Sequence, residues 1–87
     1  MRDTTFDKLQ ETLEEQFTWP TKYLFKFIVD KDNQQPVLDL FDDAQFKRRP
    51  SRNGKYVSLT ALVRMPSSDA VIDIYRKAAT IKGVITL

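Results

Sequence analysis

The chain has 87 residues, of which 41% are hydrophobic and 30% are charged, with two glycines and four prolines. This composition indicates one globular domain near the lower size limit for an independent core, and it excludes a disordered chain. The absence of histidine and cysteine excludes an imidazole base, a thiolate nucleophile, a disulfide scaffold and an ordinary zinc or iron site. We therefore expect no catalytic residues, metal or cofactor, and a binding protein rather than an enzyme.

Charge is distributed unevenly along the chain, although the net charge is only +2. Residues 1–43 carry ten acids and five bases, whereas residues 44–87 carry nine bases and two acids. This polarity favours self-association or an anionic partner, unless the two halves offset each other within one fold. No apolar run exceeds three residues and the start is acidic, so we expect a cytoplasmic protein without a membrane segment or import peptide.

The first predicted element is an amphipathic helix over residues 4–17. Thr4 and Asp7 form the pattern of a capping box at its start. The helix ends before Pro20, because the residue that precedes a proline avoids helical backbone. Apolar residues form one stripe along this helix: Phe6, Leu9, Leu13 and Phe17. We expect this stripe to dock on the rest of the domain.

A strand is predicted over residues 22–29, where side chains alternate between two faces. One face is rich in aromatic residues and is expected to face the core: Tyr23, Phe25, Phe27 and Val29. The other face mixes lysines with aliphatic residues: Lys22, Leu24, Lys26 and Ile28. This second face is apolar enough to need partial cover, which we expect from the N-terminal helix or from a second subunit.

A short second helix of about two to three turns is predicted after the polar residues 30–35. Its apolar residues recur at helical spacing: Val37, Leu40 or Phe41, and Ala44. Asp32 or Asn33 is expected to cap this helix. Pro36 lies in its first turn, where proline is best tolerated.

Two strands joined by a hairpin follow. Residues 44–50 form a weak strand whose terminal Pro50 suits a sheet edge, and residues 55–64 form a strong strand. Between them, Asn53-Gly54 is a strong hairpin signal because both residue types tolerate positive φ. The strong strand has two faces: Val57, Leu59, Ala61 and Val63 on one, and Tyr56, Ser58, Thr60 and Leu62 on the other.

A third helix and a last strand complete the predicted order. Ser67 or Ser68 is expected to cap a helix that runs through Ala79. Its buried stripe comprises Val71, Ile74, Tyr75 and Ala78. Gly83 is expected to separate this helix from a strand over residues 84–87. The order α-β-α-β-β-α-β predicts a single α+β domain over residues 1–87. After the first helix, residues 18–87 are expected to form a split βαβ unit with a four-stranded antiparallel sheet.

Particular residues carry a resemblance to a known family: Trp19-Pro20, Tyr23, Phe25-Lys26, Pro50-Ser51, Gly54, Tyr56, Ser58-Leu59, Ile74-Tyr75, Ile81, Val84 and Leu87. Over residues 17–87 the chain resembles the YbeD-like proteins, small bacterial proteins grouped as a domain of unknown function. The most specific part is the hairpin motif Pro50, Ser51, Gly54, Tyr56 and Ser58. The resemblance implies a ferredoxin-like βαββαβ plait similar to the ACT-type regulatory domains that sense amino acids, and a fold by itself does not define a function.

The basic hairpin, residues 47–55, is the most suggestive functional stretch. Its candidate contacts to a nucleic acid or another anion are Arg48, Arg49, Arg52, Lys55 and Tyr56. The aromatic signature of an RNA-recognition strand is not met, because Lys55 and Val57 occupy two of its aromatic positions. The alternative, a solvated hairpin whose charges keep an edge strand from pairing with other chains, is favoured.

Two further groups have structural explanations that we favour. The acidic residues Asp30, Asp32, Asp39, Asp42 and Asp43 fit no calcium loop, so a solvated helix face is preferred. Tyr56, Ser58 and Thr60 could form the floor of a small ligand site, but cross-strand pairs that stabilise the sheet explain them better.

These observations predict a regulatory or protein-interaction module. Its partner is expected to be another protein or a second copy of the chain, bound through a sheet edge or the uncovered sheet face. Binding of RNA or another anion through residues 47–55 is the alternative function. A small-molecule sensor of the ACT type is the third hypothesis.

Overall fold

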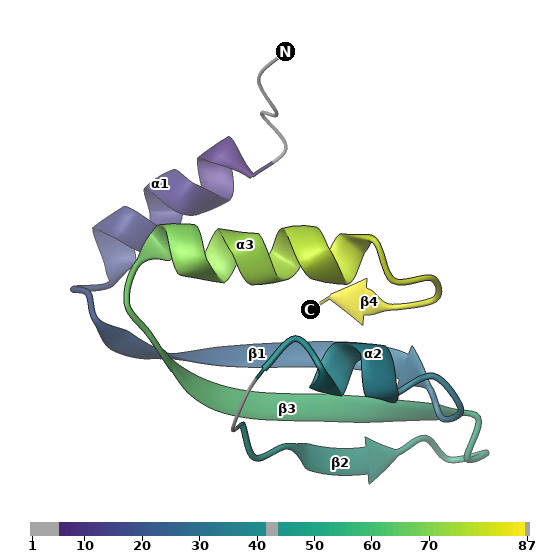
Figure 1. Cartoon of the computed structure of the whole chain (residues 1–87). Helices are drawn as coiled ribbons and strands as arrows, with labels where there is room; N and C mark the ends of the chain where they lie inside the picture. The colour runs from purple at the N-terminus through teal and green to yellow at the C-terminus, as the bar shows by residue number, and fades with distance from the viewer. Residues whose placement is uncertain (1–5, 42–43, 87) are drawn as a thin grey trace.

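The computed structural model describes residues 6–41 and 44–86 (Figure 1). In chain order the elements are α1 (Asp7–Gln16), β1 (Thr21–Asp30), α2 (Gln35–Leu38), β2 (Lys47–Pro50), β3 (Tyr56–Met65), α3 (Ser68–Ala79) and β4 (Ile85–Thr86). The strands form one antiparallel sheet in the order β2-β3-β1-β4. This confirms the predicted α+β class and the predicted plait with a preceding helix.

The two central strands, β1 and β3, pair along their whole length, from Thr21 opposite Met65 to Asp30 opposite Tyr56. Their side chains alternate between the two faces of the sheet, as the sequence predicts. On one face Phe25, Phe27, Val29 and Leu59 are fully buried, with 0% exposure. The aromatic face of β1 is therefore the core side, as predicted.

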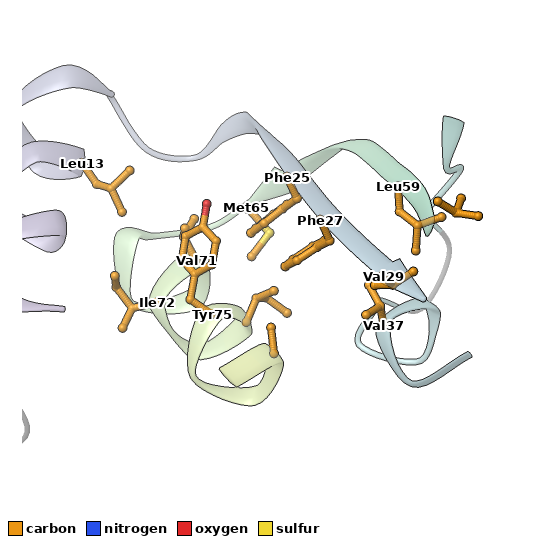
Figure 2. Packing of buried hydrophobic residues seen from close by; sticks show 13 residues of the cluster. Leu13, Phe25, Phe27, Val29, Val37, Leu59, Met65, Val71, Ile72 and Tyr75 are labelled. Carbon is orange, nitrogen blue, oxygen red and sulfur yellow. The ribbon is translucent and has the colours of Figure 1, made fainter. Parts of the chain in front are cut away.

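The core lies between this face of the sheet and the helices. Figure 2 shows Phe25 and Phe27 projecting from β1 toward Val71 and Tyr75 of α3. The rings of Phe25 and Phe27 are stacked with centroids 6.2 Å apart, and the ring of Tyr75 lies 5.6 Å from that of Phe25. Val37 of α2 fills the opposite end of the core, beside Val29 (Figure 2).

Helix α3 has the predicted start, end and buried stripe. The Ser67 side chain caps it by accepting a hydrogen bond of 3.2 Å from the backbone N–H of Ala70. Asp69 lies in the first turn, where a carboxylate favours the positive end of the helix dipole. Beyond the predicted stripe, Ile72 is also buried, so α3 buries a wider face than the sequence predicts.

Helix α1 packs beside α3, on the same side of the sheet (Figure 1). Leu13 enters the core, the Phe6 ring stacks 6.5 Å from Tyr75, and the Phe17 ring lies 5.7 Å from Tyr23. The prediction that α1 covers the second face of the sheet is therefore wrong, because its stripe finds aromatic partners on the core side. The helix begins at Asp7 without a side-chain cap, and Thr4, the predicted cap, lies outside the described residues.

Helix α2 is shorter than predicted and has a different cap. It spans only Gln35–Leu38, and Gln34 precedes it without a side-chain capping bond. Asn33 instead donates to the backbone oxygen of Lys82 at 3.1 Å. Pro36 lies in the first turn as predicted.

The early end of α2 has a packing reason. The Phe41 ring lies 5.1 Å from that of Phe25, so this residue is drawn onto the core in place of a regular next turn. Asp32, the other predicted cap, donates its backbone N–H to the carboxylate of Asp30 at 3.0 Å. The predicted continuation of the helix to Ala44 is wrong, and Asp42 and Asp43 lie outside the described residues.

The two outer strands are also shorter than predicted. β2 begins at Lys47 rather than at residue 44, and it forms one edge of the sheet, as Pro50 suggested. β4 has two residues, and Gly83 (φ +80°) precedes it as the predicted break. Leu87, the predicted strand end, lies outside the described residues.

Candidate functional site

The sheet face turned away from the helices, here called the open face, carries the second set of alternating side chains. Register pairs Leu24 with Leu62 and Lys22 with Arg64 across β1 and β3, and Ile28 with Ile85 across β1 and β4. The open face comprises Lys22, Leu24, Lys26, Ile28, Asp30, Lys47, Arg49, Tyr56, Ser58, Thr60, Leu62, Arg64 and Ile85.

Large apolar side chains remain in water at the open face. Leu24 is 56% exposed and Leu62, directly opposite it, is 60% exposed. Ile85 is 53% exposed and Tyr56 is 41% exposed. Such exposed residues are ordinary when scattered singly, but a contiguous group rimmed by polar residues is typical of an interaction site.

The charges of the open face are mostly positive. It carries one acid, Asp30, and these cations: Lys22, Lys26, Lys47, Arg49 and Arg64. Within residues 6–41 and 44–86, these cations form no ion pair. Their positive potential is therefore available to attract an anionic partner, most strongly at low salt.

The hairpin at one end of the open face is built by its own side chains. The backbone N–H of Ser51 donates to the oxygen of Tyr56 at 2.8 Å, and the Ser51 hydroxyl accepts the Tyr56 N–H at 3.1 Å. The Ser51 hydroxyl also donates to Oδ1 of Asn53, which accepts the N–H of Lys55 as well. Gly54 has positive φ (+72°), whereas Asn53 does not, so the predicted hairpin is confirmed with only one residue in that conformation.

The residues predicted to contact an anion do not all lie at one place on the surface. Arg49, Arg52 and Tyr56 surround a hollow of about 500 Å³, which Ser51 and Ser58 also line. Lys55 instead lies over the Tyr56 ring, 5.8 Å from its centroid. Arg48 pairs in register with Leu59, on the core side of the sheet, and is thus separated from Arg49 by the thickness of the strand.

A larger groove of about 880 Å³ lies beside the end of β3, and the sequence did not predict it. Leu24, Thr60 and Leu62 line it from the open face, and Phe41 and Met65 line it from the core side. The groove exists because β2 is shorter than β3. Strand lengths after pairing were not evident from the sequence, since residues 44–50 carry only a weak strand pattern.

Two other kinds of group were considered as candidate sites in the described residues. No cluster of acidic side chains in residues 6–41 and 44–86 has the arrangement of a metal site. Burial, together with the 2.9 Å hydrogen bond to the Tyr23 hydroxyl, raises the pKa of the Tyr75 phenol well above its usual range, so this group stays protonated. In the same part of the chain, no helix combines the length and hydropathy needed to cross a membrane.

The topology and the single uncovered face define a ferredoxin-like plait with an additional N-terminal helix. A family model described as a protein of unknown function (DUF493) matches residues 14–87, and the chain belongs to this family, which comprises the YbeD-like proteins. No curated protein and no solved structure gives a significant match.

Proposed function

We propose that this chain is a small cytoplasmic protein-interaction module without catalytic activity, and that its open face binds an acidic protein partner. The observation that carries this proposal is the pair Leu24 and Leu62, exposed side by side on a face whose charges are mostly positive. Protein interfaces combine an apolar centre with a polar rim, and arginine is enriched in them relative to the rest of the protein surface. The cations would speed association with an acidic surface.

The aliphatic centre favours protein over RNA as the partner. RNA-binding sheets present aromatic rings on which bases stack. In β1 the aromatic side chains Tyr23, Phe25 and Phe27 lie on the core side, so Tyr56 is the aromatic residue that β1 and β3 present on the open face.

The test uses adjacent arginines on opposite faces of β2. The wild-type chain, Arg49→Glu and Arg48→Glu are immobilised, and proteins retained from a lysate of the native cell are compared. These two variants change the net charge equally and both residues are exposed. We expect one retained protein to fall at least about tenfold with Arg49→Glu and to remain with Arg48→Glu.

The double variant Leu24→Ser/Leu62→Ser should lose the same protein, because it removes the apolar centre. Equal retention of every protein by all variants would contradict the proposal. Recovery of nuclease-sensitive material in place of a protein would favour RNA binding.

Anion binding at the hairpin is the second candidate function, and the hollow between Arg49, Arg52 and Tyr56 favours it. It predicts retention on a polyanion column that falls steeply with salt and weakens in Arg52→Ala. Elution of the wild type at low salt would argue against it. Small-molecule sensing stays a third prediction, which a thermal-shift screen with metabolites tests.

A further inference from the structure

β3 is longer than the strand beside it, and this difference leaves a backbone edge unpaired. β3 spans Tyr56–Met65, whereas β2 pairs only with the part from Val57 to Thr60. Beyond Thr60, no strand of the described residues pairs with β3 on this side. The N–H and C=O groups of such an edge are a template for an added strand.

The hydrogen bonds of the hairpin show which residues turn their backbone groups toward this edge. The oxygen and the N–H of Tyr56 both bond to Ser51, on the β2 side. Because successive residues of a strand direct these groups to alternate sides, Leu62 and Arg64 direct theirs to the same side as Tyr56. They lie beyond the end of β2 and meet no strand of the described residues there.

The groove described above lies along this edge. It runs between β3 and the segment that leads into β2, and its walls include Leu24, Phe41, Gln45, Leu62, Val63 and Met65. An extended segment placed there would continue the line of β2. Its alternate side chains would lie beside Leu62 and Arg64 on one face and beside Val63 and Met65 on the other.

β2 itself does not offer a comparable edge. All four of its residues are exposed, three of them are cations, and Pro50 has no N–H to donate. Charged residues and proline on an edge strand prevent pairing with other chains. Strand addition is therefore hindered along β2, whereas no strand of residues 6–41 and 44–86 occupies the edge of β3 beyond Thr60.

We propose that the partner of this module supplies an extended segment, with acidic residues alternating with apolar ones, that adds as an antiparallel strand to β3 at Leu62 and Arg64. The acidic residues would lie on the open face near Arg64 and Lys47, and the apolar ones would enter the groove beside Val63 and Met65. This inference rests on the proposed function and names the chemistry of its partner. Strand addition of this kind takes affinity from backbone bonds and specificity from alternate side chains.

A second copy of the chain is a poorer occupant of this edge. Two copies paired antiparallel through this edge of β3 would bring Arg64 of one copy near Arg64 of the other. Like charges placed across strands are destabilising. The charge of the site thus favours an acidic segment from another protein.

The first test measures binding of a synthetic peptide of about six residues, alternating aspartate and valine, to the full chain by fluorescence anisotropy. In an antiparallel addition, the aspartates beside Leu62 and Arg64 also direct their N–H groups to β3. N-methylation of the aspartates should weaken binding at least about tenfold, whereas N-methylation of the valines should leave it within about twofold.

The second test follows the backbone amides of the chain by hydrogen exchange. Peptide addition should slow exchange at Leu62 and Arg64 by about tenfold or more, while Ser58 and Thr60, already opposite β2, change little. Arg64→Glu should weaken peptide binding about tenfold, and Arg48→Glu, on the other face, should not.

Absence of peptide binding, equal effects of the two methylation patterns, or unchanged exchange at Leu62 and Arg64 would overturn strand addition. Protection of these amides by dimerisation without peptide would overturn it in favour of self-pairing. The proposed function is decided separately, because the lysate comparison of Arg49→Glu with Arg48→Glu requires binding to the open face but no added strand.

Discussion

The two faces of the sheet are made by the same two strands and differ in almost every property. On the core face, Phe25, Phe27 and Leu59 are fully buried under the helices. On the open face, Leu24 and Leu62 are more than half exposed among cations. Alternation along a strand thus lets one ten-residue segment bury one half of its side chains in the core and present the other half on the open face.

The comparison is tested most directly by Leu59→Ala and Leu62→Ala, the same substitution on opposite faces of β3. Leu59→Ala should lower the free energy of unfolding by about 2–5 kcal/mol, because it leaves a cavity in the core. Leu62→Ala should change it by less than about 0.5 kcal/mol. Urea denaturation measures both. Similar losses in both variants would show that the open face is covered in solution.

Gly54→Ala tests the hairpin that joins β2 to β3. No atom within 4 Å obstructs an added Cβ, so the expected loss arises from the backbone alone, at φ +72°. We expect a decrease of about 1–2 kcal/mol in the free energy of unfolding. Thermal denaturation provides the measurement. A loss near that of Leu59→Ala would mean that the hairpin determines the core packing, which would weaken the contrast between the faces.

The buried phenol of Tyr75, on the core side of the sheet, predicts how the free energy of unfolding depends on pH. Its pKa in the folded state lies above the unfolded value of about 10, so protonation of its phenol favours the folded state. This contribution is complete below pH about 10 and is lost as pH rises toward the folded-state pKa, by at most about 1.4 kcal/mol per pH unit. Denaturation curves measured from neutral to alkaline pH should decline less steeply in Tyr75→Phe. Parallel declines in both proteins would contradict the prediction.

The smallest expected effects are those of Arg48→Glu and Arg49→Glu on stability. Both side chains are exposed on an edge strand and form no ion pair within residues 6–41 and 44–86. Each variant should change the free energy of unfolding by less than about 0.5 kcal/mol. Chemical denaturation of both checks this expectation. A large loss in Arg49→Glu alone would mean that any loss of binding in this variant reflects misfolding.

Much of the fold was predictable because its signals are local. Alternation identified both central strands and the core face of β1, and a cap at Ser67 or Ser68 and the break at Gly83 marked the ends of regular elements. The hairpin was evident from Asn53-Gly54. The second face of β1 was predicted as a mixed lysine and aliphatic surface. Its expected cover by the N-terminal helix was wrong, since α1 packs on the aromatic residues of the core side, and cover by a second subunit stays a prediction.

The sequence by itself determined which side chains share a face, because that depends only on the period of a strand. Only the tertiary structure decided which face is covered, where α2 ends and how far β2 follows β3. Those outcomes depend on contacts between distant residues, such as Phe41 with Phe25 and Lys47 opposite Thr60. The unpaired edge at Leu62 and Arg64 is of this second kind: it arises from the difference in length between two paired strands.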